Sequence, residues 1–174
     1  FFFKQKKAYE ILTCNWSSDV CSSDLNEANL LKLANKVGVG PILLNSTKNF
    51  LVMEFLDGEK IGDWINLLSG KRSVDKIKSV IRKILEDCYN LDQVGFDHGE
   101  LSSIVKHVIV GKKTTMIDFE SSSTERRVAN VTSATQGIFI GSGISKKVQR
   151  LYKIPPKDKI IEALREYKKE QTRN

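Results

Sequence analysis

Apolar residues recur every three or four positions over several stretches of the chain, which is the spacing of an amphipathic helix. The longest stretch follows Ser73, which we expect to cap a helix running to about Leu91, because its hydroxyl can accept a free backbone N–H. One face of that helix is apolar over its whole length. The same spacing predicts helices over residues 26–37, 59–68, 130–140, 145–152 and 157–171.

Short apolar runs between these helices predict strands. Residues 41–44 and 50–56 flank a polar turn, and residues 105–110 and 116–119 flank a second turn that contains Gly111. Each pair of runs is typical of two antiparallel strands. Helices and short antiparallel strands in this order predict an α+β fold.

The first 25 residues do not resemble native protein sequence. Residues 16–25, WSSDVCSSDL, match the in-frame translation of a string that resembles a read adapter used in sequencing libraries, with the last codon one base short. Residues 4–11, KQKKAYEI, match the translated flow-cell oligonucleotide except at Lys7. Two such matches in one frame rarely arise by chance. We therefore expect residues 1–25 to be an adapter-derived artefact and exclude them from reasoning about the fold.

The remaining chain is basic, because the three lysines of residues 1–25 balance the three acids there and the formal charge of +7 belongs to residues 26–174. Such a surface favours phosphate-rich partners, either a nucleotide or RNA, although an ordinary solvated surface explains the charge equally well. Outside the adapter-like segment the chain has one cysteine, Cys88, which argues against a disulfide framework. No apolar run approaches the roughly 20 residues of a membrane span. We expect a cytoplasmic protein with no membrane partner.

Polar residues with catalytic potential follow the long predicted helix in a fixed order. A loop, residues 97–101, reads DHGEL; the second predicted hairpin comes next, and its last strand runs into MIDFE at residues 116–120. Protein kinases place the same elements in this order, as H-R-D-L-x-x-x-N, a hairpin and D-F-G. With the runs KHVIV and RRVANVT, these motifs make residues 26–152 resemble the atypical, RIO-like archaeal predicted serine/threonine protein kinases.

The resemblance implies a protein-kinase-like fold that is truncated at its N-terminus. Residues 26–56 would be a remnant of the kinase N-lobe, with helix C, strands 4 and 5 and the hinge. Residues 57–174 would form a mainly helical C-lobe. The implied cofactors are ATP and Mg²⁺.

Each acid of the two motifs has an implied role. Asp118 would hold Mg²⁺, a hard cation that prefers carboxylate oxygens; the alternative is an aspartate that ends a strand in a turn. Glu100 would orient or deprotonate the acceptor hydroxyl, with Asp97 as a second candidate for this catalytic role. His98 would brace the backbone of the loop.

The loop also departs from the kinase pattern. Val105 stands five positions after the acid, where kinases place a metal-binding asparagine. Alignment on the following strand instead puts His107 there, with two extra residues, so His107 is the second candidate metal ligand. Lys106 is a candidate catalytic residue that could neutralise phosphate charge, or else an ordinary surface lysine. Glu120 replaces the glycine of D-F-G and adds negative charge near the metal.

Residues 51–58, LVMEFLDG, resemble the fifth strand and hinge of a kinase. On that alignment the Glu54 carbonyl and the Leu56 amide would bond adenine, with Met53 at the back of the pocket. Glu27 would pair with a lysine of the third strand. We expect that the adapter replaced this strand and the glycine-rich loop over the phosphates, so that this fragment is nearly inactive.

The resemblance therefore implies an ATP–Mg²⁺-dependent phosphotransferase that acts on Ser/Thr of a protein substrate. The alternative is a pseudokinase or a module that binds RNA or a ribonucleoprotein. Its basis is a set of basic residues: Arg126, Arg127, Lys146, Lys147, Arg150 and the C-terminal helix. A third interpretation is a small-molecule kinase, since such enzymes share the loop and metal motifs.

Overall fold

The computed structural model describes residues 21–47, 50–70, 72–141 and 143–171, with side chains from Asn26 onward. Residues 1–20, most of the adapter-like segment, lie outside the described residues, and the backbone of residues 21–25 belongs to helix α1 (Cys21–Lys36). Helices and short antiparallel strands share the chain, so the predicted α+β class is confirmed. Among the residues that the structure describes, no helix is both long and apolar enough to cross a membrane.

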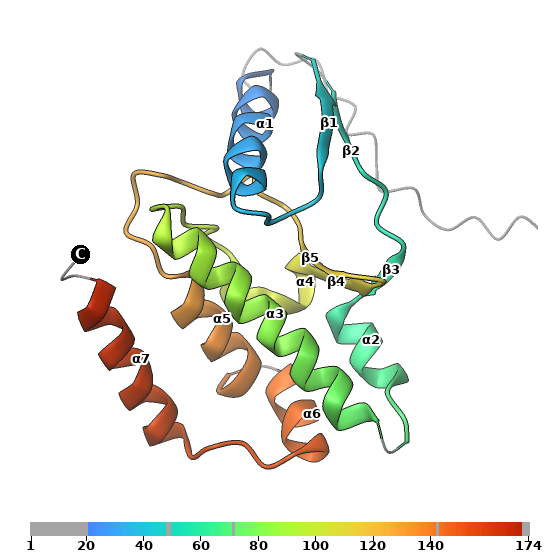
Figure 1. The fold of residues 1–174 in the computed structure, drawn as a ribbon, viewed down its shortest axis with the longest axis vertical. Helices are drawn as coiled ribbons and strands as arrows, with labels where there is room; N and C mark the ends of the chain where they lie inside the picture. The colour runs from blue at the N-terminus through green and yellow to red at the C-terminus, as the bar shows by residue number, and fades with distance from the viewer. Residues whose placement is uncertain (1–20, 48–49, 71, 142, 172–174) are drawn as a thin grey trace, which may run out of the picture.

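Helix α3 (Ser73–Gln93) runs through the middle of the larger, mainly helical part of the molecule (Figure 1). Its apolar face is buried, including Ile77, Ile84 and Leu91, as the periodicity predicts. Helices α5, α6 and α7 lie in the same part, and α5 packs on both α3 and α6. Their bounds are α5 (Asn130–Phe139), α6 (Gly143–Leu151) and α7 (Lys157–Gln171).

The predicted serine cap of α3 is wrong. Arg72 occupies the N-cap position, no side chain makes a capping hydrogen bond there, and Ser73 is already the first helical residue. The Ser73 hydroxyl is buried and has no hydrogen-bond partner among the described residues. Packing of the helix against its neighbours, rather than a cap, therefore fixes where α3 begins.

Two small sheets lie in different parts of the fold (Figure 1). Strands β1 (Leu43–Ser46) and β2 (Leu51–Met53) pair antiparallel, as predicted, and α1 packs on β1. The second sheet has three antiparallel strands in the order β3-β4-β5. Their bounds are β3 (Gly58–Lys60), β4 (Val108–Gly111) and β5 (Thr114–Met116).

Strand β3 was not predicted, because residues 59 and 60 were assigned to the following helix. That helix, α2, begins only at Ile61 and ends at Leu67. Glu59 instead pairs with Val110 of β4, more than forty positions along the chain by their numbers. Gly58 permits this pairing, since a Cβ there would lie 2.7 Å from the Val110 carbonyl oxygen. Pairing with a distant strand therefore overrode the local helical pattern.

The predicted strand over residues 105–110 starts three positions too early. A short 3-10 turn, η1 (Leu101–Ser103), leads into helix α4 (Ile104–His107), and β4 begins at Val108. Ile104 and Val105 are β-branched, which favours a strand in isolation. In the structure Ile104 is buried in the core, and the Val105 side chain fills the space beside the bare Cα of Gly62.

Phe119 joins the α1–β1–β2 part to the helical part. Its side chain is 1% exposed and packs edge-on against Phe96 in the helical part. On its other side lies Gly40, where a Cβ would be 2.8 Å from the ring and 3.0 Å from Leu31 of α1. The core is continuous across this junction, so the two parts share one set of packed side chains.

Replacement of Gly40 tests this junction, and Gly70 supplies a matched control. Both glycines have left-handed backbone, with φ of +85° and +83°, but a Cβ on Gly70 would meet nothing within 4 Å. Each alanine should cost about 1–2 kcal/mol for the backbone. Gly40→Ala should lose a further 1–3 kcal/mol or so from overpacking against Phe119. Equal losses for the two variants in urea unfolding would contradict a tight junction at Phe119.

Candidate active site

Three residues from separate elements converge beside the β4–β5 hairpin. Glu100 directly precedes η1, His107 is the last residue of α4, and Asp118 follows β5 by two positions. One ligand atom of each lies within 4.8 Å of the others. The structure thus brings together a predicted catalytic acid and the two predicted metal ligands. We refer to these three residues as the acid–histidine cluster.

His107 stands between the two acids and turns a different ring nitrogen to each. Its Nε2 lies 3.1 Å from Glu100 Oε2, and its Nδ1 lies 3.3 Å from Asp118 Oδ2. The buried Nδ1 makes no hydrogen bond among the described residues, so its approach to Asp118 is a close contact only. The histidine side chain is 4% exposed, whereas the two carboxylates are about half exposed. The carboxylates therefore line the solvent side of the cluster, with the imidazole behind them.

Two carboxylates beside one imidazole would be stabilised by an additional positive charge. A neutral imidazole carries one N–H and can donate to only one of the two carboxylates. Its other nitrogen then presents a lone pair to carboxylate oxygens, which repels them. A cation held between the three groups would remove the repulsion. Two carboxylates and an imidazole are also ordinary ligands for divalent cations.

Asp118 has an unusual backbone. Its φ is +73°, and it is the one non-glycine residue with positive φ in the part of the chain that the structure describes. This conformation costs roughly 1–2 kcal/mol for most side chains, although aspartate tolerates it better than a branched residue. A non-glycine residue held in left-handed backbone beside other polar groups is a common mark of a functional site.

The neighbours of Asp118 explain how this backbone is held. The Ile117 amide donates to the His107 carbonyl at 3.0 Å, and the Ile117 carbonyl accepts from His98 Nε2 at 3.1 Å. On the other side the Phe119 ring is buried in the core. With residues on both sides fixed, Asp118 turns its carboxylate toward His107 and out of the sheet.

His98 braces the loop, as the resemblance implied. It is buried against the rings of Phe119 and His107. Burial lowers the pKa of His98 below its usual value, so the ring is neutral at pH 7. The Ile117 carbonyl can only accept, which places the ring proton on Nε2. The buried Nδ1 has no hydrogen-bond partner among the described residues.

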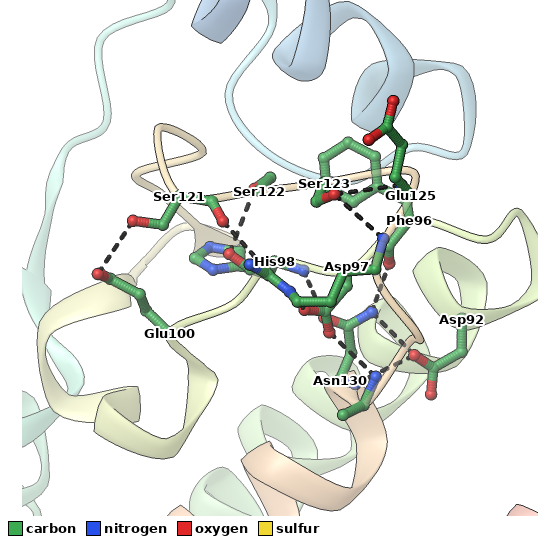
Figure 2. Close-up of polar contacts among 12 residues, drawn as sticks. Asp92, Phe96, Asp97, His98, Glu100, Ser121, Ser122, Ser123, Glu125 and Asn130 are labelled. Carbon is green, nitrogen blue, oxygen red and sulfur yellow. Dashed lines mark hydrogen bonds and ion pairs between the residues drawn. The ribbon is translucent and has the colours of Figure 1, made fainter.

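Asp97 lies on the other side of His98 from Glu100 and outside the acid–histidine cluster (Figure 2). Its buried carboxylate accepts from Arg126 Nε at 2.6 Å and from the Ala129 amide at 3.0 Å. Its backbone also exchanges two hydrogen bonds with Ser123, each 2.8 Å. The geometry therefore favours a structural role for Asp97, which fixes residues 121–129 to the loop, over the catalytic role considered from the sequence.

Asp92 and Asn130 support the loop from below (Figure 2). Asp92 accepts from the Asn130 and Val131 amides, the free donors at the start of α5, and from Asn130 Nδ2. Asn130 in turn donates to the Phe96 carbonyl and accepts from the His98 amide at 2.8 Å. Tyr167 of α7 donates to Asp92 at 2.9 Å, and burial raises the pKa of this tyrosine.

The sequence reasoning missed this pair. A signal existed, because Asp92 follows Cys88 by four positions and so falls on the apolar face of α3. An acid on such a face is rarely buried unless it has partners. Its partners, however, lie 38 positions away at the start of α5, which the sequence pattern alone does not specify.

The structure separates the two possible alignments of the loop. Val105 packs beside Gly62 of α2, away from the acids, whereas His107 directly precedes β4 and faces both of them. The alignment on the strand is therefore the one that the geometry favours. Lys106 is exposed and makes no contact with the cluster in the described part of the chain, and Glu120 is likewise exposed.

The predicted hinge, residues 51–58, lies along β2 and the loop that follows it, residues 54–57. The Glu54 carboxylate accepts from the Ile42 amide and pairs with Lys113 of the β4–β5 turn, and this hydrogen bond lowers the pKa of Glu54. Between described residues, the Glu54 carbonyl and the Leu56 amide make no hydrogen bond. Met53 is exposed rather than enclosed, and Glu27 lies half-buried in α1.

No protein-family profile matches the chain. The chain is 30% identical over 97 residues to the uncharacterized protein MJ1211 of Methanocaldococcus jannaschii. The matched region covers 56% of this chain and 80% of that protein.

The pKa of His98 predicts an acid-sensitive fold. Because burial holds the folded pKa below the unfolded value of about 6.5, the unfolded state binds a proton that the folded state lacks as pH falls below that value. Stability should be complete above about pH 6.5 and fall with a slope of up to about 1.4 kcal/mol per pH unit below it. Urea unfolding at several pH values should show this slope.

The control for this measurement is His98→Gln, which keeps His107 and every carboxylate. The variant will be less stable at all pH values, but the difference from the wild type should shrink as the pH is lowered. A constant difference between pH 7.5 and pH 5 would mean that His98 does not hold a depressed pKa.

Proposed function

The chain belongs to the family of the Methanocaldococcus jannaschii protein, and we propose that its role is phosphoryl transfer from ATP, with a divalent cation held by the acid–histidine cluster. The acceptor would be a serine or threonine of a protein substrate. The cluster is the single observation that carries this proposal, since it joins Glu100, His107 and Asp118 from three elements. The RIO-like kinase resemblance supplies the reaction class.

The residues present fit a divalent cation. The two half-exposed carboxylates supply the hard oxygen atoms that Mg²⁺ prefers, and the buried imidazole supplies a nitrogen that Mn²⁺ accepts more readily than Mg²⁺. When bound, the cation would offset negative charge on the phosphoryl group being transferred. The strained backbone of Asp118 supports the same interpretation, because it aims the carboxylate at this position.

Each residue of the site would then have its own role in the transfer. Asp118, His107 and one oxygen of Glu100 would hold the cation. Glu100 would orient the acceptor hydroxyl and take its proton, since it lies in the loop beside the cation site. The Glu54 carbonyl and Leu56 amide, which make no hydrogen bond to described residues, could bond the edge of an adenine, and Met53 beside them is exposed.

The non-catalytic alternative, an RNA-binding or ribonucleoprotein-binding module, receives less support from the geometry. Of the basic residues that motivated it, Arg126 is bonded to Asp97 and Ser121, and Lys147 donates to the Gly62 carbonyl. Arg127 and Arg150 are exposed. A small-molecule kinase would use the same cluster, so only the identity of the acceptor separates it from the main proposal.

Asp118→Asn should abolish tight cation binding while the fold is kept. Asparagine has the same shape but lacks the anionic oxygen, so the Mn²⁺ affinity of this chain should fall about tenfold or more. Titration followed by the electron paramagnetic resonance signal of free Mn²⁺ measures this directly. Asp63→Asn, at an exposed aspartate of α2, is the matched control and should bind Mn²⁺ like the wild type.

Glu100→Gln should separate binding from transfer in the protein expressed from the complete reading frame of the gene. ATP affinity should stay within a factor of two or so, because the side chain keeps its size, but transfer to a protein acceptor should slow by about 10²–10⁴-fold. Glu125→Gln, at an exposed acid of the 121–129 segment, is the control. A wild-type protein that binds ATP–Mg²⁺ and never transfers phosphate would instead favour the pseudokinase interpretation.

A further inference from the structure

The Glu100 carboxylate faces a serine of the same chain. The Ser121 hydroxyl donates to Glu100 Oε1 at 3.1 Å (Figure 2). The other carboxylate oxygen, Glu100 Oε2, lies 3.1 Å from His107 Nε2. One carboxylate therefore joins a hydroxyl to the cation site, with one oxygen for each. A general base for a hydroxyl acceptor requires this geometry, since the base must lie within hydrogen-bond reach of the proton that it removes.

The backbone of Ser121 is fixed by neighbouring groups. Arg126 Nη2 donates to the Ser121 carbonyl at 2.9 Å, and the Nε of the same side chain is held by the buried Asp97 carboxylate. The Ser122 hydroxyl donates to the His98 carbonyl, and Ser123 exchanges two backbone hydrogen bonds with Asp97. The segment around Ser121 is thus bonded to the loop that carries Glu100.

Gly99 makes room for this arrangement. Its φ is +91°, and a Cβ there would lie 2.5 Å from Arg126 Nη2 and 2.7 Å from the Ser121 carbonyl oxygen. Any other residue at this position would push the arginine and the serine away from the loop. The glycine of the DHGEL motif therefore permits the close approach of the segment that follows Asp118.

From this geometry we infer that Ser121 is an acceptor for phosphoryl transfer within its own chain. The inference rests on the proposed function, because it needs a nucleoside triphosphate as co-reactant. The Oγ of Ser121 bonds to the γ-phosphorus, and the bond from that phosphorus to the bridging oxygen breaks. The hydroxyl proton passes to Glu100, and the nucleoside diphosphate leaves.

A phosphate on Ser121 would also change the cation site. It would place three oxygens and up to two negative charges beside Glu100 and the other members of the acid–histidine cluster. Divalent cations should then bind more tightly to the phosphorylated chain than to the unmodified one. This consequence can be measured without nucleotide.

The test uses the protein from the complete reading frame, with ATP, Mg²⁺ and casein as an external protein acceptor. Trypsin cleaves after Lys113 and Arg126, so Ser121 is released in the peptide of residues 114–126, and fragmentation in the mass spectrometer locates the phosphate. We expect phosphate on Ser121 in the wild type and in Thr124→Ala, and none at this peptide in Ser121→Ala. Thr124 is the matched control, an exposed hydroxyl three positions along the same segment.

Two further measurements distinguish transfer within the chain from transfer between chains and add a readout besides activity. The rate per molecule should not depend on protein concentration, and an Asp118→Asn chain mixed with the wild type should remain unmodified. Phosphorylated protein, freed of nucleotide, should bind Mn²⁺ at least about fivefold more tightly than the same protein after phosphatase treatment.

The outcomes separate the inference from the proposed function. Phosphate on casein with none on Ser121 overturns the inference and leaves the proposed function standing, as does phosphate confined to Ser122, Ser123 or Thr124. Modification of the Asp118→Asn chain overturns transfer within one chain. An unchanged Mn²⁺ affinity overturns the placement of Ser121 at the cation site. No phosphate on either casein or the chain overturns both proposals.

Discussion

The constraint on which the site depends is the close approach of two carboxylates on either side of one imidazole. Glu100 and Asp118 both lie within about 3.3 Å of the same buried ring, His107, from opposite nitrogens. Two negative groups held this close to one partner repel each other unless a positive charge lies among them. A fold that keeps them there must hold each by its backbone.

A chain of hydrogen bonds leads from the core to the loop that carries Glu100. Asp92 caps α5 from α3, and Asn130 at the start of α5 fixes the backbone of the loop at Phe96 and His98. His98 then holds the carbonyl before Asp118. Asp92 and Asn130 have their partners at the start of α5 and in the loop before η1, where backbone donors and acceptors are free. Removal of one member would leave a buried group unpaired, which typically costs about 1–3 kcal/mol.

The sequence predicted most of the helices and the order of the chemical groups, because both depend on local pattern. The C-terminal helix matches its predicted range, and the apolar face of α3 is the buried one. Prediction was wrong where a distant contact decided the outcome: β3 pairs with β4, and the cap expected at Ser73 is absent. The position of His107 was open between two alignments, since a two-residue insertion in a loop leaves no periodic signal.

The same reasoning explains which site residues the sequence could and could not assign. Glu100 and Asp118 were candidates from motif and chemistry, whereas the structural role of Asp97 depends on Arg126, 29 positions away. Ser121 belongs to a polar run with no distinguishing pattern, and only the fold shows that its hydroxyl meets Glu100.

The central claim is that His107, Glu100 and Asp118 together hold a divalent cation. Pulsed electron paramagnetic resonance of Mn²⁺ bound to this chain tests it most directly, because a coordinated imidazole nitrogen produces a characteristic hyperfine coupling. The account predicts one such coupling in the wild type and its loss in His107→Gln, with the fold unchanged. Bound Mn²⁺ without any nitrogen coupling, or a coupling that survives in His107→Gln, would contradict it.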